Sequence, residues 1–277
     1  MKTLGFVLCL LTAVTASCIH DYDSALHGGK FSYTGLGGPL NWHGLDKKHN
    51  SLCARGRNQS PINIDSSIHT GTGRLSLSIP ASIAVFENLG PTVEVTLPKG
   101  QLFTRTGKYA LQQFHFHTPS EHRINDEYYP LEVHFVFKDT ADRIAVVAFV
   151  FELSENGRGD ALFENILSLV QNIAIPGKAT RTGRLMFGDL ASHLESNLAY
   201  EYSGSLTTPP CTEHVSWFIS AKPLSLSVKN YNAVKHVLKF NSRYTQNTPG
   251  QDNLLEVAAC QIPAITTEFE SGRQELR

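Results

Sequence analysis

The chain has 277 residues, of which 41% are hydrophobic and 18% charged, and its formal net charge is −1 at pH 7. Because acidic and basic residues nearly balance and no basic stripe occurs, neither nucleic acid nor a membrane surface is expected as a partner. The length suits one large domain, and no repeat, low-complexity tract or linker divides it.

The N-terminus predicts a secretory signal peptide. An early lysine precedes an apolar run over residues 4–14, and small residues follow it. This run is shorter than the ~20 residues that a membrane-spanning helix needs. We therefore expect residues 1–17 to be removed and residues 18–277 to form a single secreted, extracellular domain.

The predicted elements are mainly strands. Clusters of Gly, Pro, Asn and Asp separate them, as in antiparallel sheet proteins. The run at 144–153 is apolar on both faces over most of its length, which predicts a central buried strand. In chain order the strands are expected at 75–79, 92–97, 109–117, 131–137, 144–153 and 214–220.

Two segments have the apolar spacing of helices. One covers residues 162–173, and the other covers residues 228–238 after a predicted N-cap at Ser227. Both are predicted to pack against the sheet.

Three histidines occupy the strands expected at 109–117 and 131–137. His115 and His117 are two residues apart in one strand, so they share a face, while phenylalanines alternate on the other face. His134 is central in the second strand and can meet them from there. Three imidazoles from two strands predict an open zinc site, in which the fourth position is left for water; such sites are catalytic.

Two other interpretations apply to the same window. His122 fits an ordinary hydrogen-bonded histidine. The spacing from His115 to Glu121 also fits the H-x-H-x-x-x-E core of cupins, in which the glutamate is itself a ligand. However, Tyr109 stands where cupins have glycine, and no Pro-x-Gly pattern precedes His134. The sequence around the histidines therefore disfavours a cupin.

Five cysteines are present, and Cys9 would leave with the signal peptide. The even number that remains suits disulfides in an oxidising compartment. Spacing alone does not choose among the pairings of Cys18, Cys53, Cys211 and Cys260. No Cys-x-x-Cys occurs, so a zinc role for these residues is not expected.

Four motifs in order resemble the α-class carbonic anhydrases, and the resemblance covers nearly all of the mature chain. They are Gln-Ser-Pro-Ile-Asn-Ile-Asp at 59–65, the segment 113–122, Glu-Val-His-Phe-Val at 132–136, and Gly-Ser-Leu-Thr-Thr-Pro-Pro at 204–210 followed by Trp217. The resemblance implies a mainly β (β-rich α+β) fold, with one large twisted, mostly antiparallel sheet of about ten strands and short peripheral helices.

The resemblance also implies a function. It predicts a secreted zinc-dependent carbonate dehydratase, a lyase that reversibly hydrates carbon dioxide to bicarbonate and a proton through a zinc-bound hydroxide. Esterase activity would be a side reaction. The implied partner is this small-molecule substrate, and the protein would be a monomer or a homodimer.

Residue by residue, His115, His117 and His134 match the Zn²⁺ ligands of the family. Thr207 matches the threonine that accepts a hydrogen bond from the zinc-bound hydroxide, and Glu121 matches the glutamate that receives the threonine's own proton. Glu121 is therefore an orienting acceptor under this resemblance and not a ligand.

Further positions match the surroundings of the family's metal site. Gln113 and Glu132 match the partners that hold the rings of His115 and His134. The substrate pocket is expected to be lined by Val136, Val146, Leu206, Thr207, Thr208 and Trp217.

One position departs from the family pattern. Its fastest members carry a proton-shuttling histidine where this chain has Pro91, and proline cannot carry a proton. The resemblance therefore predicts a working but slower enzyme that relies on buffer or on water chains. Tyr33 and Asn88 are the residues expected to order such water.

The resemblance also suggests a disulfide pairing. Extracellular members join the segment before the Gln-Ser-Pro motif to the cysteine after Thr-Thr-Pro-Pro, which pairs Cys53 with Cys211. Cys18 and Cys260 would then pair with each other or bridge two subunits.

A catalytically silent binding module and a zinc esterase are the alternative functions. Inactive relatives typically lose zinc histidines, whereas this chain keeps all three together with Thr207 and Glu121. The hydratase is therefore favoured.

Overall fold

Three neighbouring strands form the centre of the fold. In the computed structural model, which describes residues 31–71 and 75–261, they are β7 (Gly107–His117), β10 (Leu131–Lys138) and β11 (Ile144–Leu153). β10 pairs antiparallel with both of the others. β11 is buried over most of its length, as predicted from its apolar residues on both faces.

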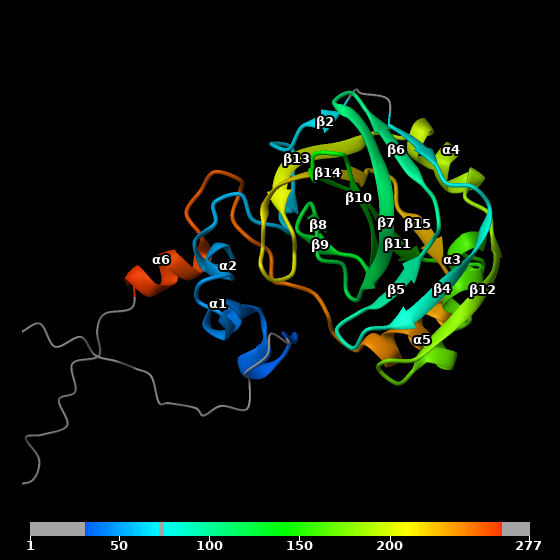
Figure 1. Ribbon diagram of the computed structural model, residues 1–277, viewed down its shortest axis with the longest axis horizontal. Helices are drawn as coiled ribbons and strands as arrows, with labels where there is room; N and C mark the ends of the chain where they lie inside the picture. The colour runs from blue at the N-terminus through cyan, green and yellow to red at the C-terminus, as the bar shows by residue number, and fades with distance from the viewer. Residues whose placement is uncertain (1–30, 72–74, 262–277) are drawn as a thin grey trace, which may run out of the picture.

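The neighbouring strands extend this centre into one curved sheet (Figure 1). It has 12 strands, and the order along its main path is β12-β4-β5-β7-β10-β11-β14-β13-β2. Most pairs are antiparallel, but β14 and β15 run parallel to β11. The mainly β class is thus confirmed, with a mixed sheet and more strands than the ten expected. The other strands are β2 (Thr70–Gly71), β3 (Ser76–Ser78), β4 (Ser82–Asn88), β5 (Val93–Thr96), β6 (Gln101–Thr104), β12 (Ala179–Leu185), β13 (Ala199–Ser205), β14 (Glu213–Ser220) and β15 (Leu224–Leu226).

All six strands predicted from the sequence are present, with ends shifted by at most two residues. The strands that were not predicted include β12 and β13, which lie at or near the sheet edges. β12 reads Ala-Thr-Arg-Thr-Gly-Arg-Leu and buries only Thr182 and Leu185. Because edge strands bury few side chains, their hydrophobic alternation is too weak to predict them.

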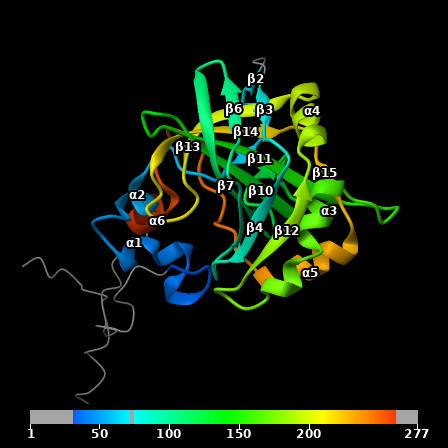
Figure 2. The same ribbon diagram turned by 45° about the vertical axis from the view of Figure 1, so that its right-hand side comes forward.

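Helices cover one face of the sheet (Figure 2). They are α3 (Ala161–Leu167), the 3₁₀ helix η3 (Val170–Ile173), α4 (Gly188–Ser196) and α5 (Val228–Leu238). The helix predicted at 162–173 is therefore an α-helix followed by a 3₁₀ turn. The predicted cap is confirmed, since the Ser227 hydroxyl accepts a hydrogen bond from the N–H of Asn230.

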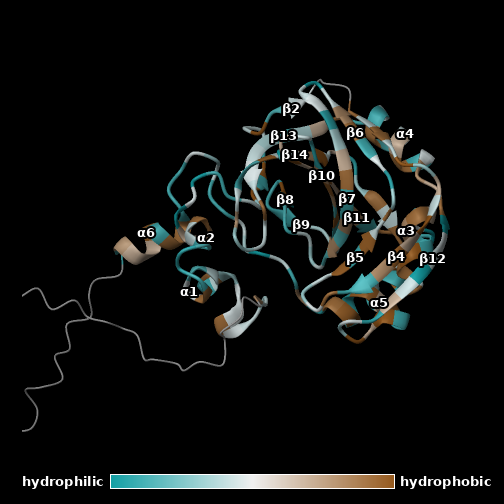
Figure 3. Ribbon diagram, in the orientation of Figure 1, coloured by the Kyte–Doolittle hydropathy of each residue, from teal (hydrophilic) through white to brown (hydrophobic). Residues whose placement is uncertain are grey.

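The main core lies between these helices and the sheet, where apolar segments of both meet (Figure 3). Phe114 and Phe135 stack with ring centroids 4.4 Å apart, and Phe163 of α3 packs on Phe135. β7 and β10 thus bury their phenylalanines on the helix side. Because side chains alternate along a strand, the histidines of β7 and β10 face the opposite side.

A small second sheet lies on that opposite side. Its strands are β1 (Asn63–Ile64), β8 (Arg123–Ile124) and β9 (Glu127–Tyr128), and β1 pairs parallel with β8. Ile64 and Ile124 belong to the same apolar cluster as Trp217 on β14. This cluster forms a second core beside the histidines.

The N-terminal part of the described chain packs at one side of the large sheet (Figure 1). Cys53 forms a disulfide with Cys211, which confirms the pairing, and both cysteines are buried in a cluster with Trp42. The segment contains η1 (Gly35–Gly37), η2 (Pro39–Asn41), α1 (Trp42–Leu45) and α2 (Ser51–Arg55), and the C-terminal α6 (Leu254–Gln261) contacts α2.

Arg243 connects this region to the rest of the fold. Its buried guanidinium donates hydrogen bonds to the carbonyl oxygens of Ser60 at 2.7 Å and Cys53 at 3.1 Å. The disulfide and Arg243 together hold the helices α1 and α2 against the loop that carries Thr207.

Some predictions fall outside the described residues. The predicted signal peptide at 1–17 and Cys18 both lie there, so the pairing of Cys18 with Cys260 stays a prediction; Cys260 is exposed on α6. Within residues 31–71 and 75–261, no helix is long and apolar enough to cross a membrane.

Replacing both Cys53 and Cys211 with serine should lower the free energy of unfolding by about 4–5 kcal/mol, because the bond closes a loop across 158 positions and restricts the unfolded chain. Denaturant unfolding measures this change. Lys99→Ala, at an exposed loop position, is the control and should leave the stability nearly unchanged. Equal stability of the double variant and the unmodified protein would contradict the prediction.

Candidate metal centre

The pairing of β7 with β10 brings the three predicted histidines together. In the register of this pair, His115 lies directly opposite His134, and His117 lies opposite Glu132. Directly opposed residues of an antiparallel pair share a face. Consequently both strands present their histidines on the face away from the phenylalanine core.

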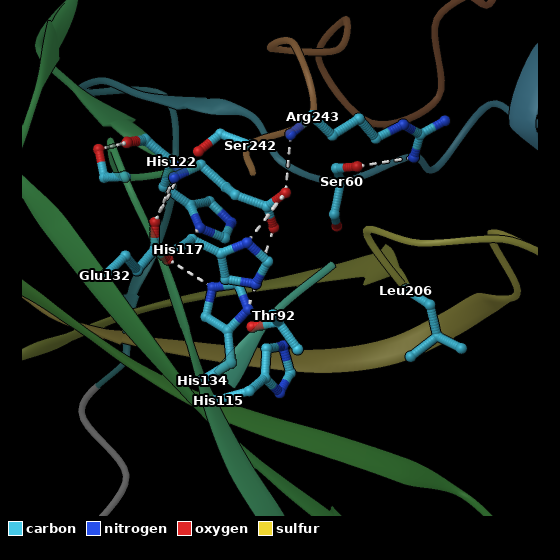
Figure 4. Close-up of polar contacts among 12 residues, drawn as sticks. Ser60, Thr92, His115, His117, His122, Glu132, His134, Leu206, Ser242 and Arg243 are labelled. Atoms are coloured by element: carbon cyan, nitrogen blue, oxygen red, sulfur yellow. Dashed lines mark hydrogen bonds and ion pairs between the residues drawn. The ribbon is translucent and has the colours of Figure 1, made fainter. Parts of the chain in front are cut away.

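The three rings form a tight cluster (Figure 4). Ring centroids are 5.0 Å apart for His115 and His117, 5.3 Å for His115 and His134, and 4.5 Å for His117 and His134. Each ring offers one nitrogen, and these nitrogens all lie within 4.8 Å of one another. Such separations suit three ligands of a single metal ion.

Hydrogen bonds determine which nitrogen of each ring is free. Nδ1 of His115 donates a hydrogen bond to Gln113 Oε1, and Nδ1 of His117 donates one to the Asn241 carbonyl. Nε2 of His134 donates one to Glu132 Oε1, and all three bonds are 2.8 Å long. Because each partner is an acceptor, the bonded nitrogen carries the proton and the other nitrogen has a lone pair. Among the described residues, the buried Nε2 of His117 has no hydrogen-bond partner. The donor set therefore fits a zinc ion.

Burial keeps the three imidazoles neutral. It lowers the pKa of His115 well below the ordinary value, lowers that of His117 to about 4, and also lowers that of His134. Only the neutral ring can bind a metal through its free nitrogen. The cluster is thus ready for a metal at neutral pH.

Glu132 organises the hydrogen bonds behind His134. Its Oε1 accepts from His134 Nε2 at 2.8 Å and from His122 Nδ1 at 2.7 Å, and its Oε2 accepts from the backbone N–H groups of Glu121 and His122. Burial alone would raise the pKa of Glu132, but His122 and His134 outweigh it and hold that pKa well below its ordinary value. Glu132 is therefore a carboxylate that orients the ring of His134.

His122, Glu132 and His134 form a second close group of potential metal ligands. However, both histidines already donate to Glu132, and the other nitrogen of His122 lies 2.8 Å from the Tyr202 hydroxyl. The group is thus occupied by its own hydrogen bonds. This agrees with the interpretation of His122 as a hydrogen-bonded histidine.

Glu121 lies close to the cluster but outside the group of potential ligands. Its Oε1 accepts a hydrogen bond from the Arg243 N–H at 2.8 Å, and its Oε2 is 4.0 Å from His134 Nδ1. Burial raises the pKa of Glu121 to about 7. His134 and the Thr207 hydroxyl act in the opposite direction and lower this pKa, but burial has the larger effect. That hydroxyl is thus near enough to affect the carboxyl, although Oε2 has no partner with hydrogen-bond geometry in the described chain.

Apolar side chains lie in a row beside the histidines. Val136 on β10 is opposite Val146 on β11, and Val146 is opposite Trp217 on β14. Leu206 packs against the same cluster and is labelled in Figure 4. The structure therefore brings together the four predicted apolar pocket residues on the histidine face.

A cavity of about 160 Å³ leads to the histidines. Two larger cavities, of about 290 and 300 Å³, lie away from them, so volume alone does not identify the site. Pro91, Tyr33 and Thr208 line the cavity as the sequence predicts, whereas Asn88 does not. The lining residues are Phe31, Tyr33, Pro91, Thr92, Glu94, Gln113, His115, His117 and Thr208.

Asn88 is engaged elsewhere and is not a water-ordering residue of this cavity. Its side-chain amide donates to the Ile173 carbonyl at 2.8 Å, and its Oδ1 accepts from the Gly90 N–H at 2.8 Å. It is only 2% exposed. The side-chain nitrogen and oxygen of Asn88 therefore both stabilise the turn after β4. For this reason the prediction that Asn88 orders water in the cleft is not retained.

Two functional features were missed from the sequence. The Asn241 carbonyl holds the ring of His117, and no sequence pattern could reveal it because any residue offers a backbone carbonyl. Glu94 lines the cavity, and burial together with the charge of Glu87 raises its pKa. The alternation of β5, with Val93 and Val95 buried, could have indicated that Glu94 faces the cleft side.

The chain is similar to known proteins of one enzyme family. A family model described as eukaryotic-type carbonic anhydrase matches residues 37–259. A carbonic anhydrase of Neisseria gonorrhoeae is 36% identical over 215 residues, which cover 76% of this chain and 81% of that protein.

Solved structures agree with this match. The α-carbonic anhydrase of Aspergillus oryzae is similar with a TM-score of 0.81 and 52% identity, over 84% of this chain and all of that one. The α-carbonic anhydrase of Thermovibrio ammonificans, solved with the inhibitor sulfanilamide, gives a TM-score of 0.72 and 31% identity over 79% of this chain and 96% of that one.

His134→Ala should lower zinc affinity at least about 100-fold, because it removes one of three free ring nitrogens. Metal analysis of the purified protein measures the zinc content per chain. His236→Ala, at an exposed position of α5, is the control and should keep its zinc. Stoichiometric zinc in a folded His134→Ala protein would show that the ligands are assigned wrongly.

Proposed function

Because this chain belongs to the carbonic anhydrase family, whose α-class members are zinc-dependent carbonate dehydratases, we propose that it hydrates carbon dioxide reversibly on a zinc ion held by His115, His117 and His134. The observation that carries the proposal is the cluster of three neutral, buried imidazoles, each with one ring nitrogen free. When bound, zinc acts as a Lewis acid that makes a water molecule a nucleophile near neutral pH, as known for carbonic anhydrases generally.

The chain's own residues hold and orient the reactants. Gln113, Glu132 and the Asn241 carbonyl accept the ring N–H groups of the three histidines and so direct the free nitrogens to one point. We propose that Thr207 donates its hydroxyl proton to Glu121, which leaves the threonine oxygen as an acceptor for the reacting water. A cation bound by the histidines would favour the charged form of Glu121 and so support this arrangement.

The apolar row provides the place for carbon dioxide. Val136, Val146, Leu206 and Trp217 offer a surface that suits a small, uncharged molecule. Thr207 and Thr208 would lie at its polar edge, where bicarbonate forms. We propose that the same arrangement hydrolyses activated esters as a side reaction.

The proton must leave along a different route than a histidine shuttle. Pro91 lines the cavity, and the resemblance to the family implies that it replaces the histidine of the fastest members. Burial raises the pKa of the Tyr33 hydroxyl well above its ordinary value, so Tyr33 stays a neutral phenol near pH 7. We propose that it orders water and does not take up the proton. We propose that external buffer takes up the proton.

We also propose that residues 1–17 are a signal peptide and that residues 18–277 form one secreted domain. The disulfide between Cys53 and Cys211 supports an oxidising compartment. Cys18 and Cys260 pair within the chain or between two chains, and a non-reducing gel distinguishes the monomer from the linked dimer. Since sulfanilamide is an inhibitor of the Thermovibrio ammonificans relative, we propose that aryl sulfonamides bind in this cleft as well.

Stopped-flow measurement of carbon dioxide hydration tests the main proposal. Activity should be readily detectable, should disappear with a zinc chelator, and should return when zinc is added back. Chelator treatment of a His134→Ala protein is the control and should change nothing. Absence of chelator-sensitive hydration in the folded, zinc-loaded protein would leave the silent binding module as the better hypothesis.

Pro91→His should raise turnover at least about tenfold in weak buffer, because it supplies a proton acceptor at the cleft. The Pro91 carbonyl, which accepts from Asn241 Nδ2 at 3.1 Å, is a backbone group and remains available in the variant. Pro91→Ala is the matched control, since it removes the ring without adding an acceptor. The gain should vanish in concentrated buffer; equal turnover of both variants in weak buffer would argue against proton exit as the limiting step.

A further inference from the structure

Glu94 places a carboxyl group in the candidate catalytic cleft. It lies on β5 between Val93 and Val95, which are both fully buried in the main core. Because side chains alternate along a strand, Glu94 points to the opposite face, where it is half-buried. β5 lies next to β7 in the sheet (Figure 1).

The register of the sheet sets Glu94 beside the metal site. Glu94 is directly opposite His115 on β7, and on its other side it is opposite Glu87 on β4. Opposed residues share a face, so Glu94 and His115 look into the same cavity. Both belong to its lining, whereas Glu87 does not.

No other charged side chain balances Glu94 in this lining. The remaining residues are aromatic rings, a proline, threonines, a glutamine and two histidines, and both histidines are proposed metal ligands. Lysine and arginine are absent from the lining within the described part of the chain. Among the described residues, Glu94 is thus the one acidic side chain that lines this cavity.

We infer that Glu94 selects ligands of the cleft by charge, favouring neutral and cationic molecules over anions. The inference rests on the proposed metal site, because the selected ligands must reach it through this cavity. A unit charge on a ligand near a half-buried carboxylate should change its affinity about three- to tenfold. The neutral substrate enters without this cost, whereas anions that compete for the metal are held less tightly.

Three benzenesulfonamides test the inference in the zinc-loaded protein. They differ only in the group para to the sulfonamide, which is hydrogen, a carboxylate or an aminoethyl ammonium. Calorimetry at about pH 8 and low ionic strength gives the Kd of each probe. This pH is far above the ordinary range of carboxyl pKa values, so the charge of Glu94 stays constant. The unmodified protein should bind the ammonium probe more tightly than the carboxylate probe.

Glu94→Gln should lower this preference about tenfold and leave the uncharged probe nearly unaffected. Glu87→Gln removes the neighbouring charge outside the cavity lining and is the matched control, for which a smaller change is expected. An unchanged preference in Glu94→Gln would overturn the inference while leaving the metal site intact. Failure of the unmodified protein to bind any of the three probes would overturn both.

Salt dependence of the unmodified protein gives a second measurement that needs no variant. Added sodium chloride should reduce the preference for the ammonium probe, because it screens the charge of a carboxylate at an open cleft. Since all probes share the sulfonamide, chloride that competes at the metal weakens each probe equally. This effect therefore cancels in the ratio of the Kd values of the carboxylate and ammonium probes. A preference that is absent at low salt, or that salt does not alter, would overturn the inference even if Glu94→Gln fails to fold.

Discussion

The register between β7 and β10 is the constraint on which the rest of the site depends. It sets His115 opposite His134 and His117 opposite Glu132, so one pairing positions both the potential ligands and one of their orienting groups. The side-chain period of a strand is two, so a shift by one residue would turn every histidine into the apolar core. The stacked Phe114 and Phe135 oppose such a shift, because both are completely buried on the other face. The core thereby determines the site.

The cost of burying polar groups explains the network around the metal centre. Glu132 and Glu121 are completely buried; Glu132 accepts hydrogen bonds from two backbone N–H groups and two histidine rings, and Glu121 accepts one from the backbone N–H of Arg243. Without these bonds their burial would be strongly unfavourable. The bond from Glu132 also fixes the tautomer of His134. Stability and preorganisation for catalysis thus arise from the same contacts.

Two sides of the cleft have different chemistry. The apolar row from Val136 to Trp217 suits a neutral gas, while the cavity lining, as far as the described residues form it, contains a single carboxyl group, that of Glu94. With Pro91 at the rim, no cavity-lining residue within the described chain acts as a proton carrier near neutral pH in the proposed mechanism. The proposed enzyme would therefore exchange its protons with small external molecules, and Glu94 would influence which of them enter.

The sequence by itself determined the class of fold and the face that His115, His117 and His134 occupy, and its resemblance to the family indicated the pairing of Cys53 with Cys211. Strand alternation is local, and the family motifs are continuous stretches of chain. The edge strand β12 and the strand β13, which lies next to the other edge, escaped prediction because they bury too few side chains to leave a pattern. Only the tertiary structure decided that the Asn241 carbonyl holds His117, that Asn88 turns away from the cleft and that Glu94 faces it opposite His115. These features depend on contacts between residues distant in the chain, which side-chain type and spacing do not specify.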